Sequence, residues 1–232
     1  MLLSDGNSKL GRRIWSFSIP AVETCPGATA ACQRACYAKK GFMAFNDVVA
    51  KYERNYEAAQ REDFVDTVVA EIRTVNAEVV RVHAAGDFYS EAYIQKWQRI
   101  ARKTSARFYA YTRSWRVPEL LGSLSAMAAI PNWELWFSVD KDCERVPDVP
   151  GVRVAYMAAE PGDFRRVRPT ADLVFIDRSQ RTAVRKAVKG VRVCPVENGV
   201  KYRYGMDCFR CGICWKPARK PKVSGGILPI IA

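Results

Sequence analysis

Short apolar runs rich in β-branched and aromatic residues recur along this chain and alternate with amphipathic stretches. This alternation is typical of strands joined by crossover helices in a parallel α/β sheet or barrel. The pattern predicts seven strands, at Ile14–Ser18, Val79–Ala84, Arg107–Thr112, Trp133–Val139, Val152–Met157, Leu173–Asp177 and Val191–Cys194.

The stretches between the early strands carry apolar residues at helical spacing. A helical region is predicted from a capping residue, Asn46, to about Asn76, with a break near Glu62. Ser90 is expected to cap the next helix, and Pro118 to open a third. The apolar faces of these helices are expected to cover the sheet.

The second half of the chain has less helical pattern. Residues 140–151 are rich in proline, aspartate and charge, and residues 159–170 show little periodicity. We therefore expect an α/β fold, an incomplete (β/α) barrel, with an open doubly wound sheet as the alternative. Residues 1–198 are expected to form this partial barrel, and residues 199–232 a basic, cysteine-rich extension packed on it.

Composition adds a charge asymmetry. The 232 residues are 49% hydrophobic, enough for a substantial core, and the formal net charge is +13. Residues 178–232 hold 13 basic and 2 acidic residues, which accounts for +11 of that charge. Such a segment indicates an anionic partner, above all nucleic acid, with a plain basic surface as the alternative. No apolar run approaches the roughly 20 residues of a membrane span, so we expect a cytoplasmic protein without membrane contact.

Eight cysteines are clustered rather than scattered, and grouped thiols in a reducing compartment are more often metal ligands than disulfides. Cys25, Cys32 and Cys36 are spaced C-x6-C-x3-C shortly after the first strand. Structural zinc normally takes four protein ligands, whereas a [4Fe–4S] cluster held by three thiolates keeps one iron open. The alternative is three buried, reduced thiols.

The second group comprises Cys194, Cys208, Cys211 and Cys214. The C-x2-C-x2-C run within it is typical of ferredoxin-like [4Fe–4S] binding, and zinc is the alternative. A single four-thiolate site drawn from both groups also stays open. Cys143 stands alone in a charged loop and is expected to be a partly exposed thiol rather than a ligand.

Polar residues follow several strands, where parallel α/β folds collect their reacting groups. Gly86 would let a ligand approach the backbone, Asp87 would accept from an amine or a ribose hydroxyl, and Arg113 would hold a carboxylate or phosphate. Alternatively, Asp87 caps a helix and Arg113 pairs with a surface acid. The candidate catalytic residues are Asp87, Arg113 and Tyr111; the candidate cofactor-binding residues are Gly86, Asp87, Ser138 and Asp177.

His83 is the single histidine of the chain. Its position inside a predicted strand favours a core histidine, on the same sheet face as Arg81 and Ala85. The neighbouring aromatic residues are expected to belong to the core rather than to a base-stacking platform: Trp97, Tyr109, Tyr111, Trp133 and Trp136.

Three stretches together resemble a known family. They read FSIPAVETCPGATAACQRACYAKKGF, VHAAGDFYSEAYIQKW and FYAYTRSW, and lie between Trp15 and Trp115. In them the chain is similar to the phage- and plasmid-borne gene product 88 domain proteins. This resemblance implies a protein of a mobile genetic element.

The layout also resembles the radical SAM superfamily, in which three cysteines follow the first barrel strand and a Gly-Gly-Glu-type motif ends the second. The resemblance implies a [4Fe–4S] cluster on the first three cysteines, S-adenosylmethionine (SAM) at Ala85-Gly86-Asp87, and an auxiliary cluster on the other four. The spacing departs from the familiar C-x3-C-x2-C, and Tyr37 follows the last cysteine instead of an aromatic preceding it. A longer first gap changes which iron is open, or admits a fourth ligand.

These observations lead to three functional hypotheses. The first is an iron–sulfur protein of a phage or plasmid with radical-SAM-like catalysis on a nucleic-acid-related substrate. The second is a non-catalytic iron–sulfur protein that binds nucleic acid or senses redox state. The third is a zinc-stabilised interaction module that docks on a host protein.

Overall fold

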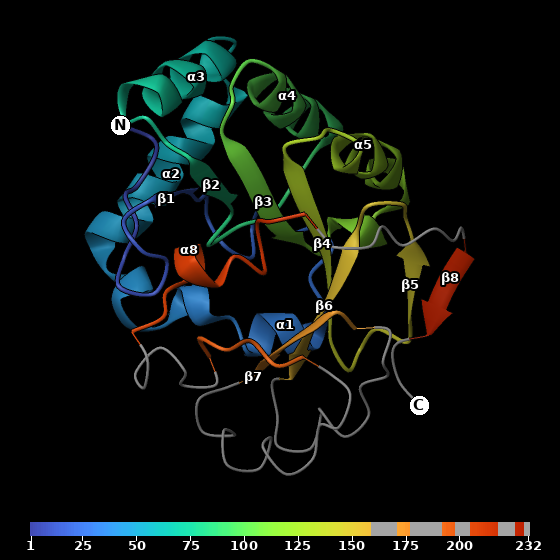
Figure 1. Cartoon of the computed structure of the whole chain (residues 1–232). Coiled ribbons are helices and arrows are strands. Elements are labelled where there is room, and N and C mark those ends of the chain that lie inside the picture. Colours follow the sequence, from blue (N-terminus) through green and yellow to red (C-terminus); the bar gives the residue numbers. More distant parts are fainter. Residues whose placement is uncertain (159–170, 177–191, 198–204, 218–225, 230–232) are drawn as a thin grey trace.

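A computed structural model describes residues 1–158, 171–176, 192–197, 205–217 and 226–229 of the chain. Six strands form one parallel sheet that curls into a half-barrel, in the order β1-β2-β3-β4-β6-β7 (Figure 1). Their bounds are β1 (Ile14–Phe17), β2 (Val79–Val82), β3 (Arg107–Thr112), β4 (Trp133–Val139), β6 (Arg153–Ala158) and β7 (Leu173–Ile176). The predicted α/β class and incomplete barrel are therefore confirmed.

Two strands arise where the sequence pattern predicts none. Strands β5 (Arg145–Asp148) and β8 (Gly226–Pro229) form a separate antiparallel pair. Strand β5 lies inside residues 140–151, which were expected to be a plain connection. Each strand contains a proline, Pro147 in β5 and Pro229 in β8, and these prolines hide the strand signal, although proline is tolerated at sheet edges.

The seventh predicted strand is mostly not formed among the described residues. Val193 makes one isolated bridge to Val174, and the predicted first residue, Val191, lies outside the described ranges. The other six strands match to within two residues in the described ranges, with β6 shifted by one residue.

Four helices cover the convex face of the half-barrel (Figure 1). They are α2 (Asn46–Gln60), α3 (Phe64–Thr74), α4 (Glu91–Arg102) and α5 (Pro118–Ala128), so the expected break near residue 62 is confirmed. Ser90 caps α4, since its hydroxyl accepts from the backbone N–H of Tyr93 at 3.3 Å. Asn46 is the first residue of α2 and not its cap; Phe45 precedes it without a side-chain cap bond.

The main core lies between these helices and the sheet. Phe17 of β1 meets Trp97 of α4 edge-on with ring centroids 5.2 Å apart, and Phe108 of β3 stacks on Trp133 at 5.3 Å. All four side chains are buried, which confirms the assignment of Trp97 and Trp133 to the core. Edge-on and offset aromatic pairs add to the free energy gained from their buried area.

The concave face is covered by the chain's own C-terminal segment. Helix α8 (Cys208–Cys211) and the residues that follow it lie across the half-barrel (Figure 1). The indole N–H of Trp136 donates to the Cys214 carbonyl at 2.9 Å, and Arg107 Nε to the Trp215 carbonyl at 3.2 Å. Trp136 and Tyr109 are buried beneath this segment, as expected of core residues.

Four short helices complete the described structure: α1 (Ala30–Arg34), η1 (Tyr37–Lys39), η2 (Gly41–Ala44) and η3 (Ser114–Arg116). The first three connect β1 to α2, and η3 follows β3. Among the described helices, none is both long and apolar enough to cross a membrane.

Candidate metal centres on the half-barrel

The loop that carries Cys25, Cys32 and Cys36, called here the N-terminal trio, packs on the carboxyl edge of the sheet. Its backbone lies directly against the end of β3: a Cβ atom on Gly27 would stand 1.9 Å from the Arg113 carbonyl oxygen. Arg116 clamps the same point by donating from Nη1 to the Gly27 carbonyl at 2.8 Å. Only glycine fits there, so Gly27 positions the loop at the mouth of the half-barrel.

Helix α1, which carries Cys32, is held by the segment after β4. The Thr29 hydroxyl caps the helix by accepting from the Cys32 N–H at 3.0 Å, and donates to Asp140 Oδ2 at 2.5 Å. Asp142 accepts from the Ala31 N–H at 2.8 Å. The Asp142 carboxylate and the Thr29 hydroxyl, itself held by Asp140, therefore satisfy two N–H groups at the start of a helix too short to be stable alone.

Arg113 lies between this helix and the sheet. Its Nη1 atom pairs with Asp140 Oδ2 at 2.8 Å, and the two side chains are only 7% and 1% exposed. The alternative drawn from the sequence was a surface acid as the partner of Arg113; its partner, Asp140, is buried. The guanidinium also acts electrostatically on Cys32: burial raises the pKa of the Cys32 thiol, and Arg113 opposes that rise.

The three thiols of the N-terminal trio act on one another electrostatically. Burial raises the pKa of Cys25 to about 12, with further contributions from Asp87, Cys32 and Cys36. A buried thiol of this kind stays protonated at neutral pH unless a metal or a cation displaces its proton. The trio is thus a compact group of thiols beside one buried arginine.

Asp87 is engaged by its own chain. Its carboxylate accepts from the Thr112 hydroxyl at 2.6 Å, from the Arg113 N–H at 2.7 Å and from the Phe88 N–H at 2.7 Å. Burial raises the pKa of Asp87, and these hydrogen bonds oppose the rise. Asp87 therefore ties the end of β2 to the end of β3 instead of capping α4.

Gly86 has φ of +82°, and a Cβ atom there would lie 2.4 Å from Ile19 Cγ1 and 2.8 Å from Thr24 Oγ1. The sequence predicted that a ligand approaches the backbone at Gly86, whereas Ile19 and Thr24 of the same chain approach it. A role of Gly86 and Asp87 in binding SAM stays a prediction.

The remaining strand-end candidates separate in space. Tyr111 lies under the C-terminal segment next to Cys214, away from the N-terminal trio. Ser138 contributes its carbonyl, which accepts from the Trp115 indole at 3.0 Å. Asp177 lies outside the described residues.

The second group, called here the C-terminal quartet, comprises Cys194, Cys208, Cys211 and Cys214 and lies on the concave face. Cys194, Cys208 and Cys214 pack with Trp136 in one apolar cluster. Burial is the main cause that raises the pKa of Cys208 to about 12 and of Cys194 to about 11, and neighbouring quartet thiols add to both shifts.

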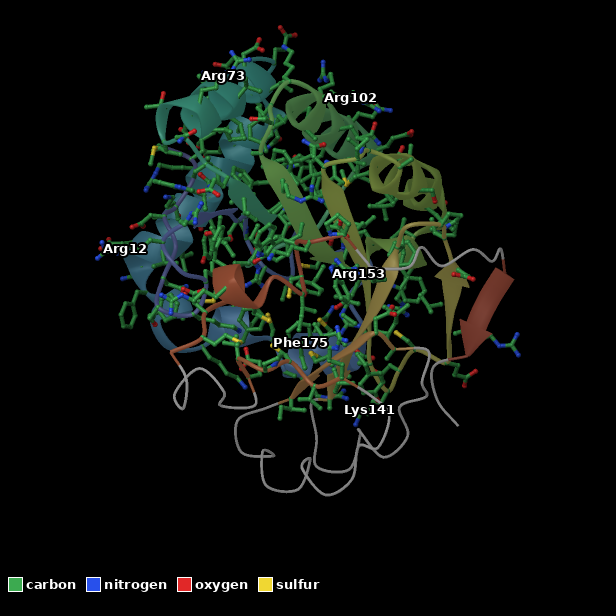
Figure 2. All side chains as sticks on the ribbon, in the orientation of Figure 1. Arg12, Arg73, Arg102, Lys141, Arg153 and Phe175 are labelled. Atoms are coloured by element: carbon green, nitrogen blue, oxygen red, sulfur yellow. The ribbon has the colours of Figure 1, made fainter. Side chains whose placement is uncertain are left out.

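Two arginines face the quartet, and sequence reasoning did not single out either one. Arg81 and Arg153 both lower the pKa of Cys214, against the larger effect of burial. Arg153 lies over the Trp136 ring at 3.9 Å and donates to the Ile213 carbonyl at 2.7 Å. Figure 2 shows Arg153 and Phe175 in the centre of the half-barrel, whereas Arg73 and Arg102 lie on its outer helices. Arginine side chains therefore act on both cysteine groups: Arg113 on the trio, and Arg81 and Arg153 on the quartet.

Arg81 also connects the two groups. Its Nη2 atom donates to the Tyr37 hydroxyl at 3.1 Å, and that hydroxyl donates to the Ala84 carbonyl at 2.5 Å. Tyr37 directly follows Cys36, and Arg81 acts electrostatically on Cys208. The signal available in the sequence was a charged residue inside an otherwise apolar strand.

Two expectations about single residues are wrong. Cys143 is buried, with 4% exposure, and its thiol lies 3.9 Å from Asp140 Oδ1. His83 is a core histidine, but it contacts α4 on the side of the sheet opposite to Arg81: Nε2 lies 2.9 Å from the Tyr93 hydroxyl. Strand β2 ends at Val82 and His83 has φ of +66°, which breaks the alternation used to place it.

All eight cysteines are free thiols. Within the described ranges, no three Cys, His, Asp or Glu side chains converge as ligands of a single ion would. The trio and the quartet are therefore described as groups of neighbouring thiols.

No solved structure matches this chain. The Gene 88 protein of Mycobacterium phage L5 is 30% identical over 209 residues, which cover 82% of this chain and 77% of that protein. The Gene 88 protein of Mycobacterium phage D29 is 28% identical over 211 residues, covering 82% and 78%. The family model described as "Gene product 88" matches residues 1–217, which include the trio and the quartet. The match extends well beyond Trp115, and the chain belongs to the gene product 88 family.

Proposed function

We propose that this protein is an iron–sulfur enzyme with radical-SAM-like chemistry on a nucleic-acid-related substrate. The N-terminal trio would hold a reactive [4Fe–4S] cluster, and the C-terminal quartet a second one. The observation that carries the proposal is the buried Arg113 guanidinium at the carboxyl edge of the half-barrel, whose partner Asp140 accepts from Thr29, the cap of the helix that carries Cys32. A buried cation aimed at a thiol favours the thiolate, which is the form that binds iron.

The quartet supports the proposal in the same way. Arg81 and Arg153 both lower the pKa of Cys214 and so favour its thiolate, in addition to the pairing of Arg153 with Glu134. Four thiolates in a C-x2-C-x2-C arrangement with one distant partner suit a cubane. A cluster of four irons holds its thiolates further apart than one zinc ion, whose Zn–S bonds are about 2.3 Å.

Chain topology supplies a further argument. Three cysteines follow the first strand of a parallel half-barrel, and the segments after β2, β3 and β4 converge on them through Asp87, Arg113 and Asp140. Cys25, Cys32 and Cys36 would hold the cluster, which would supply one-electron cleavage of SAM once an external electron donor has reduced it.

The residues of the chain would position the cluster. Arg113 and Asp140 fix the end of α1 and hence Cys32, and Gly27 keeps the loop against β3. The segment after β4 and the loop together exclude water from the Arg113–Asp140 pair, which is almost completely buried.

A non-catalytic iron–sulfur protein that senses redox state is the second candidate. The observation that favours it is that Gly86 and Asp87, the residues expected at the SAM amino group, are engaged by Ile19, Thr24 and Thr112 of the same chain. A zinc-stabilised module that docks on a host protein is the third.

The test is a metal inventory of protein purified without oxygen. Iron, sulfide and zinc are measured per chain, and EPR spectra of the reduced protein are compared with and without SAM. About eight irons per chain and a SAM-dependent EPR change are expected. The triple variant Cys25→Ser, Cys32→Ser, Cys36→Ser should retain about half of the iron, and Cys143→Ser, the control, all of it.

Two outcomes would reject parts of this proposal. Zinc without iron or sulfide would leave the interaction module as the function. Full iron content with an EPR signal that SAM does not alter would leave the redox protein.

A further inference from the structure

The segment directly after Cys36 exposes a group of large apolar side chains. Tyr37, Phe42, Phe45 and Val49 are 55%, 62%, 64% and 39% exposed, and Met1 is the other large hydrophobic residue exposed in the described ranges. The four residues, called here the aromatic patch, fall within thirteen positions of the chain. Clustered apolar exposure of this kind marks an interaction site more often than scattered exposure does.

The patch is built into the fold. Met43, between the two phenylalanines, is buried with 9% exposure and holds η2 against the protein. The Tyr37 hydroxyl is tied to the Ala84 carbonyl at the end of β2. The exposed rings are therefore displayed from an anchored segment.

The two phenylalanine rings lie one turn of chain apart. Helix η2 is a 3-10 helix that ends at Ala44, and the N–H of its cap residue, Phe45, donates to the Phe42 carbonyl at 3.3 Å. Each exposed ring offers a surface on which an unpaired base can stack.

The charged residues around the aromatic patch indicate which class of partner it binds. Between Gln33 and Val49 the chain has three basic residues, Arg34, Lys39 and Lys40, and one acidic residue, Asp47. All three are exposed, and in the part of the chain that the structure describes none of them forms a salt bridge. Basic residues next to exposed rings fit a chain of phosphates and bases.

We infer that the aromatic patch with Lys39 and Lys40 binds single-stranded nucleic acid beside the N-terminal trio. Bases stack on Phe42 and Phe45, and the lysines neutralise phosphates. The inference rests on the proposed function in one respect: the bound strand is the substrate presented to the cluster. It differs from the expectation based on residues 178–232, because the interface lies next to Cys36.

The test is fluorescence anisotropy of the full-length protein with labelled 20-nucleotide DNA and RNA single strands, over a range of salt concentrations. Phe42→Leu with Phe45→Leu keeps the patch apolar but removes the rings, and binding should weaken at least about tenfold. Lys39→Gln with Lys40→Gln should reduce the slope of log affinity against log salt by about 1.4.

The matched charge control is Arg99→Gln with Arg102→Gln. Both arginines are exposed on α4, which lies at the opposite end of the molecule from α1 (Figure 1). This control should leave the salt slope within about 0.3 of the wild-type slope. An equal effect of the two charge variants would overturn the inference, as would leucine variants that bind within twofold of wild type.

A vesicle assay separates the other partner class. Cosedimentation with anionic vesicles that survives the leucine substitutions, without oligonucleotide binding, would overturn the inference in favour of a membrane surface. Oligonucleotide binding is measured independently of iron. If the iron-loaded wild-type protein does not bind the oligonucleotides, the inference about the patch is rejected and the proposed cluster is not. Retained binding in a protein without iron rejects the cluster alone.

Discussion

Arg113 and Asp140 form an ion pair of 2.8 Å that joins the end of β3 to the end of β4, with both side chains almost completely buried. The pair sits between the sheet and the helix that carries Cys32, so it couples the stability of the half-barrel to the position of a candidate iron ligand. Replacing one partner leaves the other as an uncompensated buried charge.

We therefore expect Arg113→Met to lower the free energy of unfolding by about 3–5 kcal/mol. The double variant Arg113→Met, Asp140→Asn should recover part of that loss, because it removes both charges. Urea unfolding of the two single variants and the double variant gives the coupling energy. Additive effects of the two substitutions would contradict a direct pair.

Gly27→Ala should push the trio loop off the sheet, because the new methyl group would overlap the Arg113 carbonyl. A loss of about 1–3 kcal/mol in unfolding free energy is expected, together with less iron at the trio. Gly122→Ala is the matched control: it lies in α5 with no atom within 4 Å of the added Cβ, and should stabilise by about 0.5–1 kcal/mol. Equal effects of the two substitutions would reject the close approach at Gly27.

Arg153→Met should loosen the C-terminal segment. Arg153 donates to the carbonyls of Ile213 and Cys214 and pairs with Glu134 at 2.8 Å. We expect faster amide hydrogen exchange in residues 205–217 and a loss of about 3 kcal/mol. Arg61→Met serves as control, since Arg61 pairs with Asp63 at the surface and the substitution should cost at most about 1 kcal/mol. Unchanged exchange in Arg153→Met would mean that other contacts hold the segment.

Acidification should destabilise the fold through His83. Burial and then Arg81 lower the pKa of His83 to about 3, from 6.5. Between these values the unfolded chain binds the proton and the folded chain does not, so stability falls as the pH decreases from about 6.5 toward 3. The slope from this group is at most about 1.4 kcal/mol per pH unit.

His83→Asn, which tolerates the positive φ at this position, should reduce that slope. The difference between the unfolding free energies of wild type and variant, measured from pH 4 to 7, isolates the histidine from other titrating groups. A difference that does not vary with pH would show that His83 binds its proton with the same pKa in the folded and the unfolded protein.

The pattern of apolar and polar residues was sufficient to predict the strands and helices of the half-barrel. The apolar runs that became β3 and β4 were predicted with their observed bounds, and Ser90 and Pro118 mark the starts of α4 and α5 as expected. These signals work because strand and helix periodicity depend on neighbouring residues alone. Strands β5 and β8 were not predicted, since their pairing joins residues about eighty positions apart.

The candidate site was predictable in its residue types but not in its contacts. Both cysteine groups and Arg113 stand out in the sequence, whereas the partner of Arg113, Asp140, is fixed by tertiary packing. The sheet face of His83 and the exposure of Cys143 were misjudged for the same reason: burial and the direction of a side chain follow from the whole fold. Tyr111 was assigned to the first site because strand ends meet at one edge, although its ring lies under the quartet.

The contact of α8 with the N-terminal segment determines when the structure can be completed. Cys208 and Phe209 donate from their backbone N–H groups to the carbonyls of Lys9 and Leu10, at 2.9 and 3.0 Å. During translation, Lys9 and Leu10 thus wait for partners about two hundred positions later, and three cysteines of the quartet emerge after all six strands. The concave face of the nascent half-barrel stays uncovered until then, so chains truncated before residue 205 would present that face to solvent.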